Sequence, residues 1–277
     1  MKRTVIAILL VTAGECATVG APGAERNREP AESDNTYALI VSGTNKDPNE
    51  SQAKDKAVET LRRFFRNNAK VRSDRLTVLV DSNSLVRKDS KISTGKNLKE
   101  QIDTFAAAVN PADRFIFYYV GQANIVTDKL RLNLPGADIT HEQLAEWIDR
   151  IKASSVLIVL DCPGAGLAVK ALARQGRIVV AACTADQHYS TRFTEYFVPA
   201  LLDNKSDTDS DGKVSLLEAF TLASKRLEDL HRRKGLLKTE TPLLEDNADG
   251  VPSRQPWRHK QDKTDGLAAS RVFLSGE

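Results

Sequence analysis

Cysteine, net charge and long apolar runs are all scarce in this chain of 277 residues. The chain has 3 cysteines, and its net charge is only +3. A charge so close to balance gives no reason to expect a nucleic-acid partner. Beyond residue 24 no apolar segment is long enough to span a membrane. The hydrophobic content of 41% and the charged content of 28% are typical of a globular protein. The length suits one large α/β domain, or one domain with a small appendage.

Residues 1–24 have the order of a secretory signal peptide. Lys2 and Arg3 precede an apolar stretch at 4–14, and small residues follow. We therefore expect export to the periplasm or the extracellular space, with no stable membrane span once the signal is removed. Lipidation at Cys16 is disfavoured because a glutamate precedes that residue.

From residue 36 onward, apolar strand-like segments alternate with amphipathic helices, after a polar and flexible lead-in at 25–35. This alternation predicts an α/β fold, with a mostly parallel, doubly wound six-stranded sheet and helices on both faces. The strands are predicted at 37–42, 76–80, 114–120, 155–160, 177–182 and 271–274. The helices are predicted at 52–68, 97–109, 140–151, 193–202 and 216–232, and a hairpin arm at 130–135.

Two of these predicted strands end in loops of small residues. Residues 114–120 run into Gly121-Gln122-Ala123, and residues 155–160 run into Asp161-Cys162-Pro163-Gly164-Ala165. Binding and catalytic sites of open α/β sheets are built at such carboxyl ends of strands. The sequence therefore places its candidate site at these two loops.

The two loops resemble those of the caspase and legumain group of cysteine peptidases (clan CD). In that group the first strand end carries Gly-His-Gly, and the second carries Asp-x-Cys-x-Ser-Gly. Four further segments are similar to bacterial caspase-like proteins with an appended calcium-type loop. They are LNLPGAD at 132–138, FTEYF at 193–197, DTDSDGKVSLLEAF at 207–220 and TETPLLEDNADG at 239–250. The resemblance implies a caspase-like domain over 36–277.

The same resemblance implies that the catalytic pair is lost. Gln122 stands where the family has its histidine, and Pro163 stands where it has its cysteine. A glutamine does not exchange protons near neutral pH, and a proline has neither a nucleophile nor an N–H to hold an oxyanion. We therefore expect a pseudo-peptidase with a binding or scaffolding role toward an unknown protein or peptide partner. In such a groove Gln122 would hydrogen-bond a peptide carbonyl, and Asp161 would hold the loop.

An alternative retains catalysis, with Cys162 as the nucleophile and His188 as the base. Side chains alternate along a strand, so Cys162 is expected to point away from the position that the family's cysteine occupies. Cys162 and Cys183 each end a predicted strand. They form either a disulfide with each other or a pair of buried free thiols. Buried free thiols are the favoured prediction.

Residues 207–218 match the calcium-loop pattern D-x-D-x-D-G-x₅-E in full. Such loops bind calcium through alternate carboxylates, one backbone carbonyl and a closing glutamate that uses both oxygens. The expected ligands are Asp207, Asp209, Asp211, the Lys213 carbonyl, Ser215 and Glu218. Predicted helices flank the loop on both sides, as in an EF-hand. A third hypothesis for the whole chain is therefore a purely structural, calcium-stabilised module.

A second acidic turn at 245–250 is only half of this motif. Pro256 stands where the closing glutamate would be. An ordinary turn is expected there, and the alternative is that it lends a ligand to the first loop.

Overall fold

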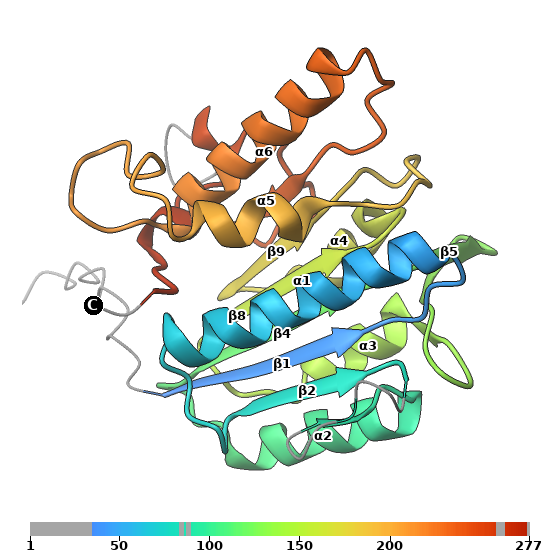
Figure 1. The fold of residues 1–277 in the computed structure, drawn as a ribbon. Helices are drawn as coiled ribbons and strands as arrows, with labels where there is room; N and C mark the ends of the chain where they lie inside the picture. The colour runs from blue at the N-terminus through green and yellow to red at the C-terminus, as the bar shows by residue number, and fades with distance from the viewer. Residues whose placement is uncertain (1–34, 83–85, 87–89, 259–263, 276–277) are drawn as a thin grey trace, which may run out of the picture. The chain divides into compact units, whose positions relative to one another are not determined.

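The computed structural model describes residues 35–82, 86, 90–258 and 264–275, so the expected signal peptide and nearly all of the lead-in lie outside the described residues. A seven-stranded sheet forms the centre, in the order β10-β9-β8-β4-β1-β2-β3 (Figure 1). Its strands are β1 (Thr36–Ser42), β2 (Leu76–Val80), β3 (Ser90–Ile92), β4 (Arg114–Val120), β8 (Ser155–Asp161), β9 (Arg177–Ala181) and β10 (Leu243–Glu245). All neighbours pair in parallel except β10, which runs antiparallel to β9.

The prediction of a mostly parallel α/β sheet is confirmed, but the predicted strand count and one predicted strand are wrong. Residues 271–274 do not join the sheet, and Phe273 makes only an isolated bridge with Ser215. The edge position beside β9 belongs to β10 instead. The two strands of the main sheet that the prediction missed, β3 and β10, are each three residues long. Such short segments are too brief to show a period in the sequence.

A separate three-stranded antiparallel sheet lies beyond the end of β4. It consists of β5 (Ala123–Val126), β6 (Lys129–Leu132) and β7 (Ile139–Thr140), in the order β5-β6-β7. The expected hairpin arm at 130–135 overlaps β6 and is confirmed in part. Residues 133–135 are loop.

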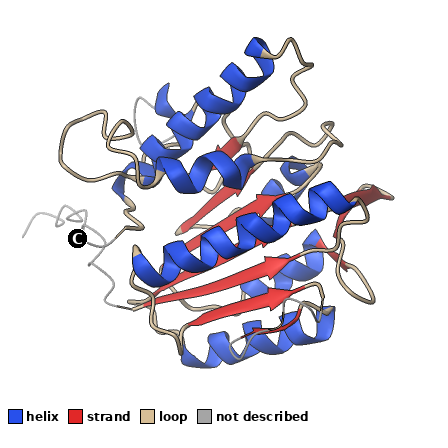
Figure 2. Ribbon diagram, viewed as in Figure 1, coloured by secondary structure: helices blue, strands red, loops and turns tan. Residues whose placement is uncertain are grey.

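Helices cover both faces of the main sheet, as predicted (Figure 2). On one face lie α1 (Pro48–Asn67), α5 (Phe193–Ala200) and α6 (Leu216–Arg233). On the other lie α2 (Gly95–Ala108), α3 (His141–Ile148) and α4 (Val169–Leu172). Among the described residues, no helix combines the length and the apolarity needed to cross a membrane.

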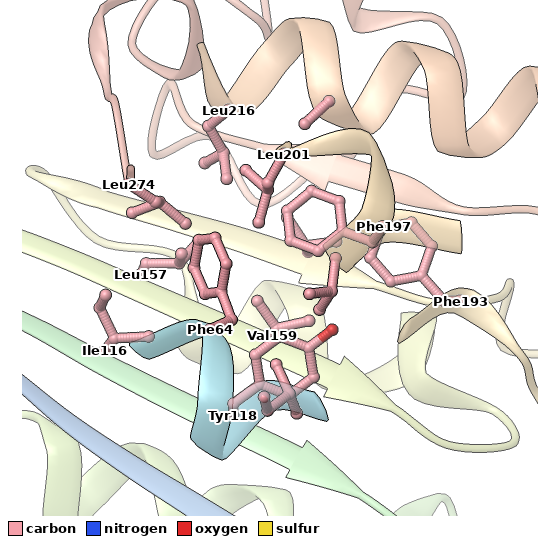
Figure 3. Close-up of a cluster of buried hydrophobic side chains, with 14 of the residues drawn as sticks. Phe64, Ile116, Tyr118, Leu157, Val159, Phe193, Phe197, Leu201, Leu216 and Leu274 are labelled. Atoms are coloured by element: carbon pink, nitrogen blue, oxygen red, sulfur yellow. The ribbon is translucent and has the colours of Figure 1, made fainter. Parts of the chain in front are cut away.

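Two hydrophobic layers result from the alternation of side chains along the strands. In β4, Ile116 and Tyr118 pack toward α1, α5 and α6, whereas Phe117 and Tyr119 pack toward α2, α3 and α4. Figure 3 shows the first layer, in which Phe64 of α1 lies against strand residues and the aromatic rings of α5. Successive side chains along each strand therefore point to opposite faces of the sheet.

Capping side chains fix where helices begin. Helix α1 starts at Pro48 rather than at the predicted residue 52, because the Asp47 carboxylate accepts N–H groups of the first turn and proline is favourable there. The capping box that opens α3 is confirmed. The Thr140 hydroxyl accepts the Gln143 N–H, and the Gln143 side chain accepts the Thr140 N–H.

Candidate functional site

The two loops singled out by the sequence lie side by side. Strands β4 and β8 pair in parallel, with Val120 opposite Asp161 at their carboxyl ends. The Gly121 N–H donates to the Asp161 carbonyl at 3.1 Å, which continues the pairing into the loops. Gly121 also packs against the backbone of Gly43 at the end of β1, where a Cβ on Gly121 would come within 2.6 Å of the Gly43 Cα.

Gln122 is held in place by its backbone and its side chain. Its Nε2 donates to Glu50 Oε2 at 3.0 Å and to Ser190 Oγ at 2.7 Å. Its carbonyl accepts the Tyr119 hydroxyl at 2.6 Å and the Asn133 N–H at 3.0 Å. Both amide hydrogens of the side chain are therefore used within the protein. The side-chain oxygen Oε1 is the group left to meet a ligand.

Asp161 and Cys162 point to opposite faces of the sheet. The Asp161 carboxylate turns toward α5, where its Oδ2 accepts the backbone N–H of Thr194 at 2.8 Å and the Thr194 hydroxyl at 2.5 Å. Cys162 is fully buried in the hydrophobic layer of α2, α3 and α4. Burial, together with the nearby Cys183 and Asp161, raises the pKa of the Cys162 thiol well above its usual range. The thiol is thus kept neutral and away from solvent.

The two cysteines form no disulfide, as predicted. The single S–H of Cys183 is instead shared between the Cys162 carbonyl, 3.3 Å from the sulfur, and the Gln187 carbonyl, 3.4 Å from it. Burial raises the pKa of Cys183 to about 12. His188, the expected base of the catalytic alternative, is exposed in the loop between β9 and α5.

Backbone amides next to Pro163 are already committed to other partners. Pro163 is buried and has no N–H to offer. The Gly164 N–H donates to the Gln187 carbonyl at 2.8 Å, and the Gly166 N–H donates to the Cys183 carbonyl at 2.9 Å. Gly164 itself has φ +66°, a conformation that favours glycine. Donors of the kind that hold a peptidase oxyanion are thus turned inward in this loop.

A cleft of about 380 Å³ opens at these strand ends on the α1 and α5 side of the sheet. Its wall combines backbone at Gly121, the amide of Gln122 and side chains of both charges. Tyr189, 64% exposed, stands at its rim. The described lining residues include no cysteine and no histidine. They are Asn45, Asn49, Glu50, Ala53, Lys54, Ala57, Val120, Gly121, Gln122, Asp161, Tyr189, Ser190, Thr191, Arg192, Thr194, Glu195 and Thr239.

Two buried carboxylates meet at the start of α5 beneath this cleft. Both oxygens of Glu240 accept the Arg192 N–H at 3.0 Å, and Asp161 accepts two donors from Thr194. Burial raises the pKa of Glu240 well above its usual range, and the charge of Asp161 adds to the shift. Burial likewise raises the pKa of Asp161. The hydrogen bonds from Thr194 lower that pKa, but they offset only part of the effect of burial. Glu240 was not among the residues that the sequence patterns indicated.

Lys54, which lines the cleft, was also not among the residues that the sequence patterns indicated. Its side chain is buried and forms an ion pair with Asp81 at 2.5 Å, at the carboxyl end of β2. Asp81 also accepts the Ser42 hydroxyl at 3.1 Å. A signal was present, because Lys54 falls on the same helical stripe as the buried Ala57 and Leu61. A lysine at such a position indicates a buried acidic partner.

The expected calcium loop, residues 207–218, lies between α5 and α6, and its last three residues form the start of α6. Ligand oxygens of Asp207, Asp209 and Asp211 lie within 4.8 Å of one another. Asp207 Oδ1 is buried and has no hydrogen-bond partner among the described residues. Ser210 and Gly212 have φ +62° and +85°, which curl the backbone around these oxygens. Of the sequence-predicted ligands, the structure therefore brings these three carboxylates together.

Glu218 and Ser215 are engaged with each other at the end of that loop. Glu218 Oε2 accepts the Ser215 N–H at 2.9 Å and the Ser215 hydroxyl at 2.8 Å, and its Oε1 accepts the Thr208 N–H at 2.7 Å. Burial opposes ionisation of Glu218, but these hydrogen bonds outweigh it and lower its pKa. The carboxylate is thus charged, and it ties the first residues of the loop to the start of α6.

Comparison with known proteins finds similarity among solved structures. No protein-family model matches the chain, and no curated protein matches it. Among solved structures, the chain is similar to the Drosophila initiator caspase Dronc, with a TM-score of 0.49 and 11% sequence identity. That alignment covers 87% of this chain and 92% of the Dronc chain.

Proposed function

We propose that this chain is an exported, non-catalytic relative of the caspase and legumain peptidases that binds a peptide in the cleft beside Gln122. The observation that carries the proposal is the position of the Cys162 thiol, which follows the cleft residue Asp161 in the sequence. Cys162 is buried in the layer under α2, α3 and α4, whereas the cleft opens on the side of α1 and α5. A nucleophile behind the sheet does not reach a peptide in that cleft.

The family part of the proposal rests on the two loops. Gly121-Gln122 and Pro163-Gly164 follow the ends of adjacent parallel strands, which is the placement that the resemblance requires. The export part rests on the order of charged, apolar and small residues at 1–24.

Binding of a peptide is favoured by the groups that face the cleft. Gln122 Oε1 is an acceptor on a side chain that Glu50 and Ser190 hold rigidly. A peptide N–H would donate to it, rather than a peptide carbonyl accepting from Gln122 as first expected, because both amide hydrogens are used. Exposed Tyr189 and Arg192 add an aromatic surface and a positive charge at the rim. A held acceptor next to exposed side chains suits an extended polypeptide.

We further propose that residues 207–218 bind calcium. Three clustered carboxylates, one of them with a buried and unpartnered oxygen, match the oxygen ligands that this cation takes. The Lys213 carbonyl, Ser215 and Glu218 would complete the shell. Glu218 already accepts the Thr208 and Ser215 hydroxyls. These hydroxyl contacts must open for both of its oxygens to reach the ion.

The test of the peptide site combines cleavage and binding on one library of quenched fluorescent peptides. We expect no cleavage, and we expect binding that Gln122→Ala weakens roughly 10-fold, the loss of about one hydrogen bond. Gln101→Ala on α2, on the opposite face of the sheet, is the matched control and should leave binding unchanged.

Two outcomes would contradict the proposal in different ways. Cleavage that Cys162→Ala abolishes would establish the alternative, an active cysteine peptidase. Absence of both cleavage and binding, with calcium binding retained, would establish the purely structural calcium-stabilised module.

A further inference from the structure

The acidic turn that follows β10 repeats the geometry of the calcium-type loop. Counted from its first acidic residue, Glu245, it has Asn247 at position 3, Asp249 at position 5 and Gly250 at position 6. The loop that begins at Asp207 has aspartates at positions 1, 3 and 5 and a glycine at position 6. The backbone also repeats. Ala248 and Gly250 have φ +68° and +74° at positions 4 and 6, where the first loop has +62° and +85°.

The internal hydrogen bonds are the same in both loops. In the second loop Glu245 Oε1 accepts the N–H of Gly250 at 3.3 Å, as the position 1 carboxylate of the first loop accepts the position 6 N–H at 3.1 Å. Asn247 accepts the N–H of Asp249 at 2.9 Å, and Asp249 accepts the N–H of Val251 at 2.7 Å. The matching distances in the first loop are 3.2 and 2.8 Å. Both backbones thus follow the same path, with the same side chains accepting N–H groups of the loop.

The second loop lacks the closing glutamate of the motif, because Pro256 stands at that position. The tertiary structure brings another acidic group to the loop. Asp265, from a later segment, accepts the Asp246 N–H at 3.1 Å. Asp246 in turn accepts the N–H groups of Gly266 at 2.8 Å and Ala269 at 2.7 Å, which fixes that segment against the turn. Asp265 lines a cavity of about 380 Å³ together with Asn247 and Asp249. The cavity is thus bordered by acidic groups from two separate parts of the chain.

A buried and unpartnered carboxylate oxygen provides independent support for a ligand. Glu245 is 0% exposed, and its Oε2 has no hydrogen-bond partner among the described residues, although its Oε1 is bound inside the loop. Asp265 is 5% exposed. Buried carboxylates that repel one another cost free energy unless a positive charge compensates them. Arg258 lines the same cavity, but it is exposed, and no ion pair between it and these carboxylates is found among the described residues.

We propose that Glu245, Asn247, Asp249 and Asp265 form a second site for a hard divalent cation of the calcium class. Carboxylate and amide oxygens are the ligands that such a cation prefers. The Val251 carbonyl, at position 7, would provide a further oxygen. This site is independent of the peptide cleft and of whether residues 207–218 bind calcium.

The test is a calorimetric titration of the full protein with calcium chloride after chelator treatment. We expect two ions per chain. Asp249→Asn should remove one ion and Asp209→Asn the other, and the double variant should bind none. Both aspartates are exposed, so neither change should unfold the protein. Glu100→Gln on α2 is the matched control for loss of a surface charge.

A second measurement uses Asp265→Asn, which removes a buried charge. In chelator this variant should melt at or above the wild-type temperature, because repulsion among the carboxylates is relieved. In calcium it should lose the stabilisation that this site gives the wild type. Arg258→Gln should leave the second ion in place.

The outcomes separate the two loops. One ion per chain that is lost in Asp209→Asn and kept in Asp249→Asn would overturn the second site and leave the first. One ion with the reverse pattern would support the second site and overturn the first. No binding in the wild type would overturn both.

Discussion

A shift of one residue along β8 separates a buried thiol from a carboxylate that faces the cleft. Asp161 turns toward α5 and Cys162 turns into the opposite layer, because successive strand residues point to opposite faces. Cys162 therefore does not reach the cleft although it directly follows a residue that lines it. Its surroundings are those of a small apolar residue rather than of a nucleophile.

The first prediction concerns the reactivity of these thiols. At pH 8 an alkylating reagent should modify neither Cys162 nor Cys183 in the native protein and should modify both after unfolding. A thiol with a pKa of about 12 is ionised in roughly one molecule in 10,000 at that pH, and burial blocks the reagent as well. Peptide mapping by mass spectrometry gives the extent at each cysteine. Ser190→Cys places a thiol in the cleft and is the positive control. Rapid native labelling of Cys162 would contradict the buried position.

At the scale of elements, the loop before α6 holds both a helix cap and the carboxylates of the proposed calcium site. Glu218 and Ser215 form a capping box, which stabilises the helix in the absence of any cation. Asp209 contributes to the cluster of carboxylates, and its one hydrogen bond in the described structure is from the N–H of Asp211. Substitutions at Glu218 and at Asp209 should therefore distinguish the effect of the helix cap from that of the proposed cation.

A pair of variants should show this separation. Asp209→Ala should lower the melting temperature in calcium and leave it unchanged in chelator. Glu218→Ala should lower it in both, since loss of the cap alone costs about 1 kcal/mol. Differential scanning calorimetry in calcium and in chelator measures both effects. An equal loss for Asp209→Ala in the two conditions would contradict calcium binding by residues 207–218.

Element length decided which strands the sequence could predict. The long apolar runs of β1, β4 and β8 were predicted within one residue at each end, because strands of seven mostly buried residues leave a clear pattern. The three residues of β10 pair with β9 only because the chain returns to that edge after α6. Nothing within three residues distinguishes such a strand from a loop.

At the scale of the whole molecule, helix α5 closes over two buried acids that come from distant parts of the chain. Asp161 ends β8, and Glu240 lies in the segment between α6 and β10. Both are 3% exposed, and each accepts backbone N–H groups at the start of α5. Burial and their mutual repulsion favour the neutral form of Glu240. Glu195 is the other acid that raises its pKa.

This arrangement predicts how stability depends on pH. An unfolded glutamate ionises near its ordinary pKa of 4.5, whereas folded Glu240 keeps its proton to higher pH. Below pH 4.5 Glu240 is protonated in both the folded and the unfolded state, and its contribution to stability is constant. As pH rises above it, the unfolded state releases a proton that the folded state retains, so folding loses about 1.4 kcal/mol for each unit by which the pKa is raised.

Glu240→Gln should therefore melt at a higher temperature than the wild type at about pH 8 and at a similar temperature at about pH 4. Thermal unfolding followed by circular dichroism across that range measures the difference. The exposed Glu100→Gln should follow the wild-type profile. A variant that is less stable than the wild type at high pH would show that ionised Glu240 stabilises the fold.

The sequence by itself determined the α/β class, the central parallel strands, the two strand-end loops and the pattern of residues 207–218. These features are local, because hydrophobic periodicity, small residues at strand ends and the spacing of carboxylates are fixed within a few positions. Only the tertiary structure decided that Glu50 and Ser190 hold Gln122, that Glu240 meets Asp161, and that Asp265 lies beside the turn at 245–250. Each of these pairings joins residues far apart in the chain, and the geometry that brings them together exists only after the layers have packed around the sheet.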